Sequence, residues 1–129
     1  MPESQPFTIE WWTLDRVRPY EQNPRVISDV AIDKVAASIR AFGWRQPIVV
    51  DDDGVILAGH TRFEAAKKLG LERVPVHVAS GLSPEAARAY RLADNRTHEE
   101  ARWNPEGLGF ELHALGAAGF DLAAAYVDC

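Results

Sequence analysis

The stretch GVILAGHTRFEAAKKLG, residues 54–70, decides the fold of this chain. It predicts a short β-strand at residues 55–57 that turns through Gly59 directly into an amphipathic helix, which Gly70 ends. Such a turn points backbone N–H groups and the positive end of the helix dipole at one place, which favours a bound anion. Arg62 adds a guanidinium there. The alternative is a routine strand-to-helix connection of an α/β domain.

Apolar periodicity and turn residues predict the elements around this stretch. Residues 48–50 form a β-hairpin with residues 55–57 across the DDDG turn. Ser28 or Asp29 caps a helix that Gly43 ends, and Ser83-Pro84 starts another. The remaining expectations are an extended piece at 11–17 and a strand at 74–78. The helix started by Ser83-Pro84 continues toward residue 98, and a last helix spans roughly residues 105–117. The predicted fold class is α+β, a small mixed sheet flanked by helices.

Length and composition indicate one globular domain. The chain has 129 residues and 47% hydrophobic content, enough to fill a single core. One cysteine, Cys129, and four scattered histidines give neither a disulfide framework nor zinc spacing. No apolar stretch approaches the roughly 20 residues of a membrane span, and no basic, apolar leader opens the chain. We therefore expect a cytoplasmic protein without a membrane partner.

Charge disfavours a large DNA-binding surface. The formal net charge is −5, and all 14 Lys and Arg residues lie before residue 105. Four arginines in one predicted helical region and its exit indicate either a local basic patch or, because glutamates are interleaved, a solvated helix face. They are Arg88, Arg91, Arg96 and Arg102.

Three segments carry a family resemblance. SIRAFGWRQPIVV at 38–50, LAGHTRFEAAKKLG at 57–70 and RLADNRTHEEARW at 91–103 resemble, in order and spacing, the three boxes of the ParB/sulfiredoxin superfamily N-terminal domain. RPYEQNPR at 18–25 and LHALGAAGFDL at 112–122 are similar to the ParB-like domains of phage proteins and of proteins with DNA methyltransferase domains. The predicted division is an N-terminal extension (1–13), a ParB/sulfiredoxin-like domain (14–104) and a C-terminal helical extension (105–129).

The resemblance implies a bound nucleoside triphosphate, which is CTP in chromosome-partitioning ParB proteins, together with Mg²⁺. Asp94 and Asn95 would approach the metal, because oxygen donors suit a hard cation that bridges phosphates. Instead of binding a metal, Asp94 and Asn95 could be polar residues of a helix face or helix end. Instead of binding nucleotide, Gln46 could be only a turn residue. The implied nucleotide-binding residues are Gln46, Pro47, Gly59, His60, Thr61, Arg62, Asp94, Asn95 and Arg96.

Two departures from the pattern bear on activity. Partition ParB proteins usually read Gly-Glu-Arg-Arg where this chain has Gly-His-Thr-Arg at 59–62, so nucleotide choice and hydrolysis do not transfer, and we expect weak hydrolysis at most. Sulfiredoxin has its catalytic cysteine where His60 stands, so reductase chemistry would lack its nucleophile. At a helix N-terminus the protonated form of His60 is disfavoured, so the neutral ring could donate a hydrogen bond or act as a base. The alternatives are a helix cap or a side chain that faces solvent.

Three functions follow as hypotheses. The first is a nucleotide-binding module in DNA transactions of phage or mobile elements, or beside a DNA methyltransferase, with DNA as a weak or indirect partner. A second copy could pack on its C-terminal helices through Leu108, Leu112, Leu115 and Phe120. The second is a ParB-like nuclease, although the DDDG run reads as a hairpin tip and a metal nuclease needs convergent carboxylates. The third is a DNA-binding accessory domain with a vestigial pocket.

Overall fold

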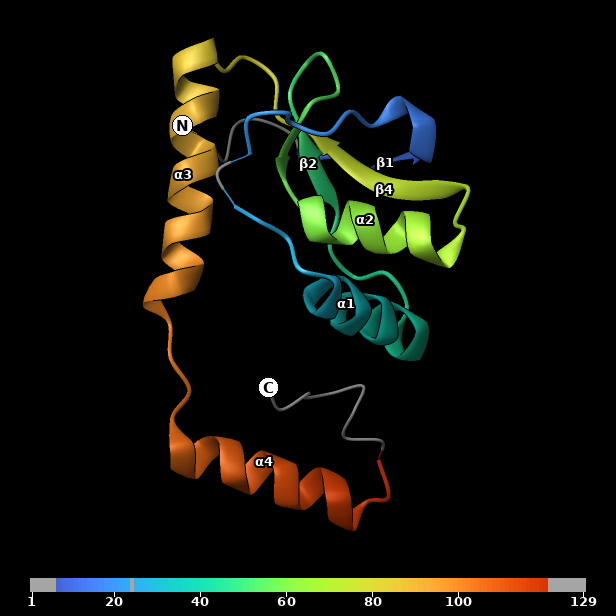
Figure 1. Cartoon of the computed structure of the whole chain (residues 1–129), viewed down its shortest axis with the longest axis vertical. Coiled ribbons are helices and arrows are strands. Elements are labelled where there is room, and N and C mark those ends of the chain that lie inside the picture. Colours follow the sequence, from blue (N-terminus) through green and yellow to red (C-terminus); the bar gives the residue numbers. More distant parts are fainter. Residues whose placement is uncertain (1–6, 24, 121–129) are drawn as a thin grey trace.

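The computed structural model describes residues 7–23 and 25–120, with only the backbone of residues 97–100. Figure 1 shows a small sheet with helices around it and a last helix that stands away from the rest. In chain order the elements are β1 (Glu10–Thr13), the 3-10 helix η2 (Leu14–Arg16), α1 (Asp29–Phe42), β2 (Ile48–Val50), β3 (Ile56–Ala58), α2 (His60–Leu69), β4 (Arg73–Val78), α3 (Pro84–Glu100) and α4 (Pro105–Ala117).

The sheet is mixed, as the sequence predicts. Its strand order is β1-β4-β2-β3. The outer pairs β1–β4 and β2–β3 are antiparallel, whereas the central pair β2–β4 is parallel and aligns Ile48 with Val76. The two central strands hold four fully buried residues, Ile48, Val50, Val74 and Val76, and Ile56 of the edge strand β3 is equally buried.

Helices position the site by packing on this sheet. Helix α2 lies against β2 and brings Phe63 and Ala66 into the core, as its periodicity predicts. Helix α1 packs on α2, and α3 runs along the edge strand β3 (Figure 1). The N-terminus of α2, strand β3 and the middle of α3 are therefore neighbours.

Local signals predict the element boundaries well. The Ser28 hydroxyl accepts from the Ala31 N–H at the start of α1, and Ser83 does the same for α3. Gly43 and Gly70 follow the last residues of α1 and α2 with positive φ angles, which glycine adopts without strain.

Both ends of the described chain contact the rest of the domain. Strand β1 pairs with β4, so residues 10–13, which the predicted division assigns to an N-terminal extension, are part of the sheet. The division itself stays a prediction. Helix α4 begins at the predicted residue, and the Phe120 ring after it stacks on Phe42 of α1 with centroids 5.9 Å apart. Residues 121–129, which include Cys129, fall outside the described part of the chain. Within the described part, no helix is both long enough and apolar enough to span a bilayer.

Candidate functional site

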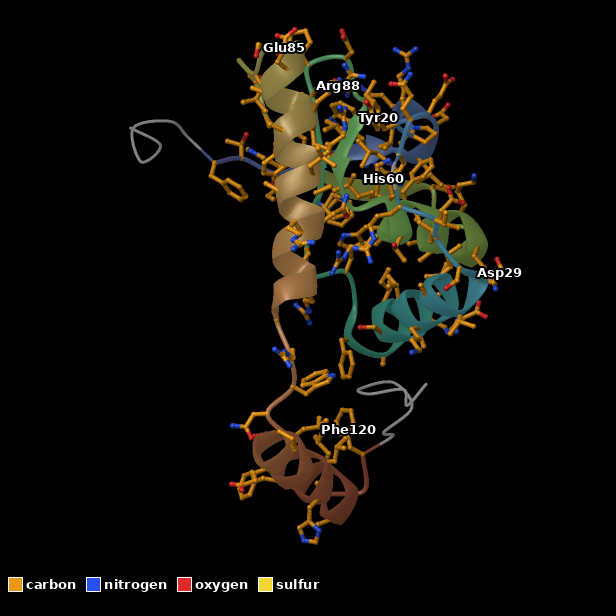
Figure 2. All side chains as sticks on the ribbon, turned by 60° about the vertical axis from the view of Figure 1, so that its left-hand side comes forward. Tyr20, Asp29, His60, Glu85, Arg88 and Phe120 are labelled. Carbon is orange, nitrogen blue, oxygen red and sulfur yellow. The ribbon has the colours of Figure 1, made fainter. Side chains whose placement is uncertain are left out.

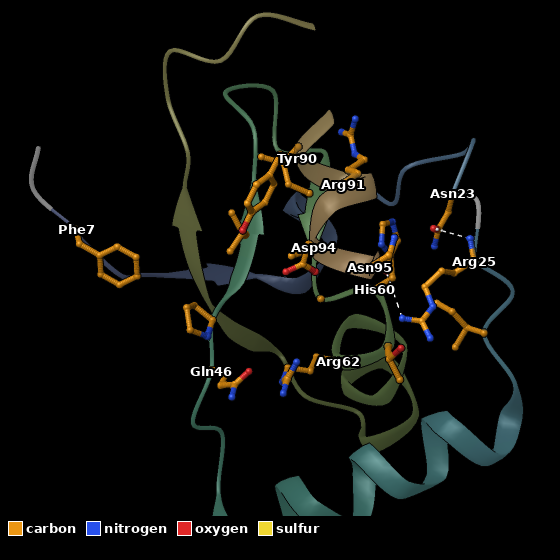
Figure 3. A pocket seen from close by; sticks show the side chains of 17 residues that line it. Phe7, Asn23, Arg25, Gln46, His60, Arg62, Tyr90, Arg91, Asp94 and Asn95 are labelled. Carbon is orange, nitrogen blue, oxygen red and sulfur yellow. Dashed lines mark hydrogen bonds between the residues drawn. The ribbon is translucent and has the colours of Figure 1, made fainter. Parts of the chain in front are cut away.

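A cavity of about 400 Å³ lies where α2 begins, beside α3 and the loop before α1 (Figure 3). Eight of the nine residues predicted from the three boxes line it: Gln46, Pro47, Gly59, His60, Thr61, Arg62, Asp94 and Asn95. The ninth, Arg96, is exposed on α3 and is not among the lining residues. The fold thus brings together segments that are about fifty residues apart in sequence.

Gly59 shapes the floor of the cavity. Its φ of 106° and ψ of 25° lie in the left-handed region, and a Cβ there would stand 3.3 Å from the Ile48 Cα. The first intrahelical bond of α2 runs from the Phe63 N–H to the Gly59 carbonyl at 2.9 Å. The N–H groups of residues 60–62 precede that bond, and no described side chain caps the helix. The helix N-terminus is therefore open toward the cavity.

His60 ties the cavity to the loop before α1. The Tyr20 backbone N–H donates to His60 Nε2 at 3.3 Å, and both residues lie in the same region of the molecule (Figure 2). This bond requires an unprotonated Nε2, and hence a neutral imidazole whose proton is on Nδ1. Burial lowers the pKa of His60 and the charge of Arg91 lowers it further, while Glu64 opposes them. Geometry and electrostatics agree on a neutral ring.

Arg62 and Asp94 form the charged centre of the cavity (Figure 3). Burial lowers the pKa of Arg62, and the carboxylate of Asp94 acts in the opposite direction. A guanidinium nevertheless stays protonated at neutral pH. Burial and then Asp94 raise the pKa of Tyr90 on α3. A cation that is half removed from water favours an anionic ligand.

Arg25 is a cavity residue that sequence reasoning missed. Its Nη1 donates to the Asn95 Oδ1 at 3.4 Å, and its backbone N–H donates to the Asn23 Oδ1 at 3.1 Å. Arg25 thereby places a second guanidinium on the side of the cavity where α2 begins. The RPYEQNPR segment contains the signal, but its pattern by itself indicates only a turn and a family resemblance.

Arg91 corrects the expectation of a solvated helix face. The residue is 6% exposed, and Nε donates to the Ile56 carbonyl at 3.0 Å. Its guanidinium lies 3.7 Å from the centre of the Tyr20 ring and 3.9 Å from the Asp51 carboxylate. Arg91 therefore holds α3 and Tyr20 against strand β3. Arg88, one turn earlier, is exposed as expected.

The mixed four-stranded sheet, the glycine turn into α2 and the cavity beside α3 define a domain of the ParB/sulfiredoxin class. Residues 4–96 match the family described as the ParB N-terminal domain, and the chain belongs to that family. The predicted fold and family are thus confirmed.

Two relatives illustrate the range of the family. A ParB-like nuclease domain-containing protein of Escherichia coli, YnaK, is 39% identical over 82 residues, which are 64% of this chain and 94% of the relative. A nucleoid occlusion protein of Bacillus cereus is 38% identical over 108 residues, which are 77% of this chain and 37% of the relative. The chain thus spans little more than a third of the nucleoid occlusion protein.

Solved structures agree on the fold. A C-terminally truncated ParB from Caulobacter crescentus, complexed with CTP-gamma-S, matches with a TM-score of 0.72 at 23% identity. The match covers 92% of this chain and 68% of the ParB chain. Sulfiredoxin from Arabidopsis thaliana has a TM-score of 0.54 at 27% identity over 64% of this chain and 96% of its own.

Proposed function

We propose that the cavity binds a nucleoside triphosphate together with Mg²⁺, and that CTP is the first nucleotide to test. The observation that carries this proposal is the convergence of an uncapped helix N-terminus with the guanidinium groups of Arg25 and Arg62 at one cavity. Three arginines and one aspartate line it, although the whole chain has a net charge of −5. A cavity of about 400 Å³ is also within the ordinary range for small ligands.

The helix N-terminus is the proposed phosphate site. The N–H groups of residues 60–62 and the helix dipole suit an oxygen anion. Arg62 comes from the first turn of the same helix and Arg25 from the loop facing it. Arginine suits phosphate because its planar fork donates two parallel hydrogen bonds. His60 is neutral and adds hydrogen-bonding capacity without a charge.

Asp94 and Asn95 are the residues that would hold Mg²⁺. Their carboxylate and amide oxygens are hard donors, and Mg²⁺ on nucleotides commonly takes one or two carboxylates with the rest of its shell from phosphates and water. The bound metal would neutralise phosphate charge. In the present structure the Asn95 amide oxygen accepts from Arg25, and Asp94 acts on Arg62. The oxygens of Asp94 and Asn95 that would bind Mg²⁺ thus interact with the same two arginines that we assign to phosphate.

The choice of CTP follows from the Caulobacter ParB structure with CTP-gamma-S. At 23% identity that likeness shows the fold alone, so cytosine as the base is part of the proposal. The departure at 59–62, Gly-His-Thr-Arg, removes one arginine and the glutamate of the usual box. We therefore expect slow hydrolysis or none, which release of inorganic phosphate measures.

We place this binding module in DNA transactions, in phage or mobile elements or beside a DNA methyltransferase. The nucleoid occlusion relatives and the Caulobacter ParB complex with the centromeric parS site support the DNA setting. The phage or methyltransferase setting rests on the resemblance of residues 18–25 and 112–122. DNA is a weak or indirect partner in this proposal, because the chain is acidic. A second copy is the other proposed partner, through Leu108, Leu112 and Leu115, which are half-buried on α4, and Phe120, which is 48% exposed. Light scattering with and without nucleotide measures that association.

Two alternatives remain as outcomes of the tests. The E. coli relative carries the name of a nuclease domain, but among the described residues no three His, Cys, Asp or Glu side chains group closely enough to hold a metal. DNA cleavage that a chelator and Asp94→Ala both abolish would favour the nuclease. DNA binding that depends on salt but is unchanged in Arg62→Ala would favour the accessory domain with a vestigial pocket.

Calorimetric titration of variants tests the phosphate site. Arg62→Ala and Arg25→Ala each remove a charged donor, worth about 1.5–3 kcal/mol, so nucleotide affinity falls on the order of 10- to 100-fold. Arg40→Ala is the matched control, because Arg40 is exposed on α1 away from the cavity. Asp94→Asn should weaken binding in Mg²⁺ more than binding in a chelator. Equal affinities for Arg62→Ala and Arg40→Ala would remove the support for this proposal.

A further inference from the structure

The cavity has two chemically different sides (Figure 3). Arg25, His60 and Asn95 lie on one side, where α2 begins. Phe7 lies on the opposite side, and Arg62 stands between them. The phosphate site proposed above uses the first side and the centre. Phe7 itself has no assigned role.

Phe7 is an exposed aromatic ring in a fixed position. It precedes β1 in the sequence and is 71% exposed. One face stacks on the His77 ring of β4, with centroids 4.3 Å apart and planes inclined by 25°. The neighbouring backbone is held as well, because His77 Nδ1 lies 2.9 Å from the Thr8 carbonyl oxygen. Two contacts therefore hold this ring at the cavity, where much of its surface meets water.

A flat aromatic ligand fits this side better than a further anion. The arginines of the phosphate site, Arg25 and Arg62, line the cavity away from Phe7, toward α2 and α3. Aromatic rings stack on one another in offset geometry, and burying the exposed ring under a ligand removes apolar surface from water. A nucleotide presents both chemistries at once, with anionic phosphates at one end and an aromatic base at the other.

We infer that Phe7 is the stacking surface for the nucleobase, so that this residue, three positions before β1, forms part of the ligand site. This inference rests on the proposed nucleotide binding. It predicts a division of labour, in which Arg25 and Arg62 contribute to every triphosphate whereas Phe7 contributes only when a base is attached. Packing of Phe7 on His77 for stability alone would show no such division.

The test compares ligands with and without a base. Calorimetry on the purified chain with Mg²⁺ uses CTP, ATP, GTP, UTP and inorganic triphosphate, for the unchanged chain and for Phe7→Ala and Phe7→Tyr. Phe110→Ala is the matched control, because Phe110 is also a phenylalanine at 71% exposure but lies on α4. Stacking of a base on an aromatic side chain is worth enough to change affinity about tenfold.

The expected result is that Phe7→Ala weakens the bound nucleotide about tenfold while triphosphate affinity stays the same. Phe7→Tyr and Phe110→Ala should keep the affinity of the unchanged chain. Nucleotide affinity that Phe7→Ala leaves unaltered would overturn the inference and leave the proposed function standing. Equal weakening of nucleotide and triphosphate would also overturn it, because Phe7 would then act through the fold. If the unchanged chain binds neither ligand, the proposed function fails and takes the inference with it.

Discussion

Replacing Gly59 with alanine should damage fold and site together. The left-handed backbone at φ 106° is strained for any residue with a Cβ, which costs about 1–3 kcal/mol. The added methyl group would also stand 3.3 Å from the Ile48 Cα in a buried strand, and such overpacking costs about 1–3 kcal/mol more. We expect Gly59→Ala to lower the free energy of unfolding by about 3 kcal/mol.

Gly70→Ala separates the two causes. Gly70 also has a positive φ, 70°, but nothing lies within 4 Å of the position that an added Cβ would take. Its substitution should cost about 1 kcal/mol. Both substitutions restrict the unfolded chain equally, so that contribution cancels in the comparison. The difference of about 2 kcal/mol is then the contact with Ile48 and the additional strain.

Thermal unfolding followed by circular dichroism measures the effect. At about 4 °C per kcal/mol for a domain of this size, Gly59→Ala should melt about 12 °C lower than the unchanged chain, and Gly70→Ala about 4 °C lower. Nucleotide affinity should fall in Gly59→Ala alone, measured below its melting temperature. Equal melting temperatures for the two variants would refute the tight approach of the α2 turn to β2.

Two further predictions concern the residues that hold the loop 18–25. Arg91→Met leaves the Ile56 carbonyl without its donor and should lower the free energy of unfolding by about 2–3 kcal/mol, measured by urea titration. Arg88→Met on the exposed face of α3 should change that free energy by less than about 0.5 kcal/mol. Similar losses in the two variants would contradict the contacts assigned to Arg91. Burial and Arg91 lower the pKa of His60 below 6.5, so the unfolded chain binds a proton more readily and stability falls as pH drops through 6.5. His60→Gln should flatten this dependence as the pH falls through 6.5. An unchanged dependence in His60→Gln would contradict the assigned role of His60.

The sequence predicted those features whose causes are local. Helix α1 begins after Ser28 and ends before Gly43 because both residues act on the backbone beside them. The hairpin of β2 and β3 follows from two apolar runs and the turn between them. The predicted cavity residues came from the family resemblance, and the fold places all but Arg96 around one cavity.

What the sequence did not predict depends on contacts between distant segments. Burial of Arg91 requires the Ile56 carbonyl and the Tyr20 ring, which lie 35 and 71 positions earlier in the chain. The interleaved glutamates around Arg91 indicate solvent when the helix is considered alone. Phe7 likewise reaches the cavity only because β1 pairs with β4 and brings it over His77. No periodicity within either segment encodes these pairings.

The measurement that tests nucleotide binding most directly is a thermal-shift and calorimetric titration with CTP, ATP, GTP and UTP, each with and without Mg²⁺. We predict saturable stabilisation by one nucleotide, CTP first among them, that depends on Mg²⁺. At a hundred times Kd the linkage amounts to about 2.7 kcal/mol, a rise in Tm on the order of 10 °C. The absence of any response at concentrations far above a plausible Kd would contradict the account and leave the cavity without its proposed ligand.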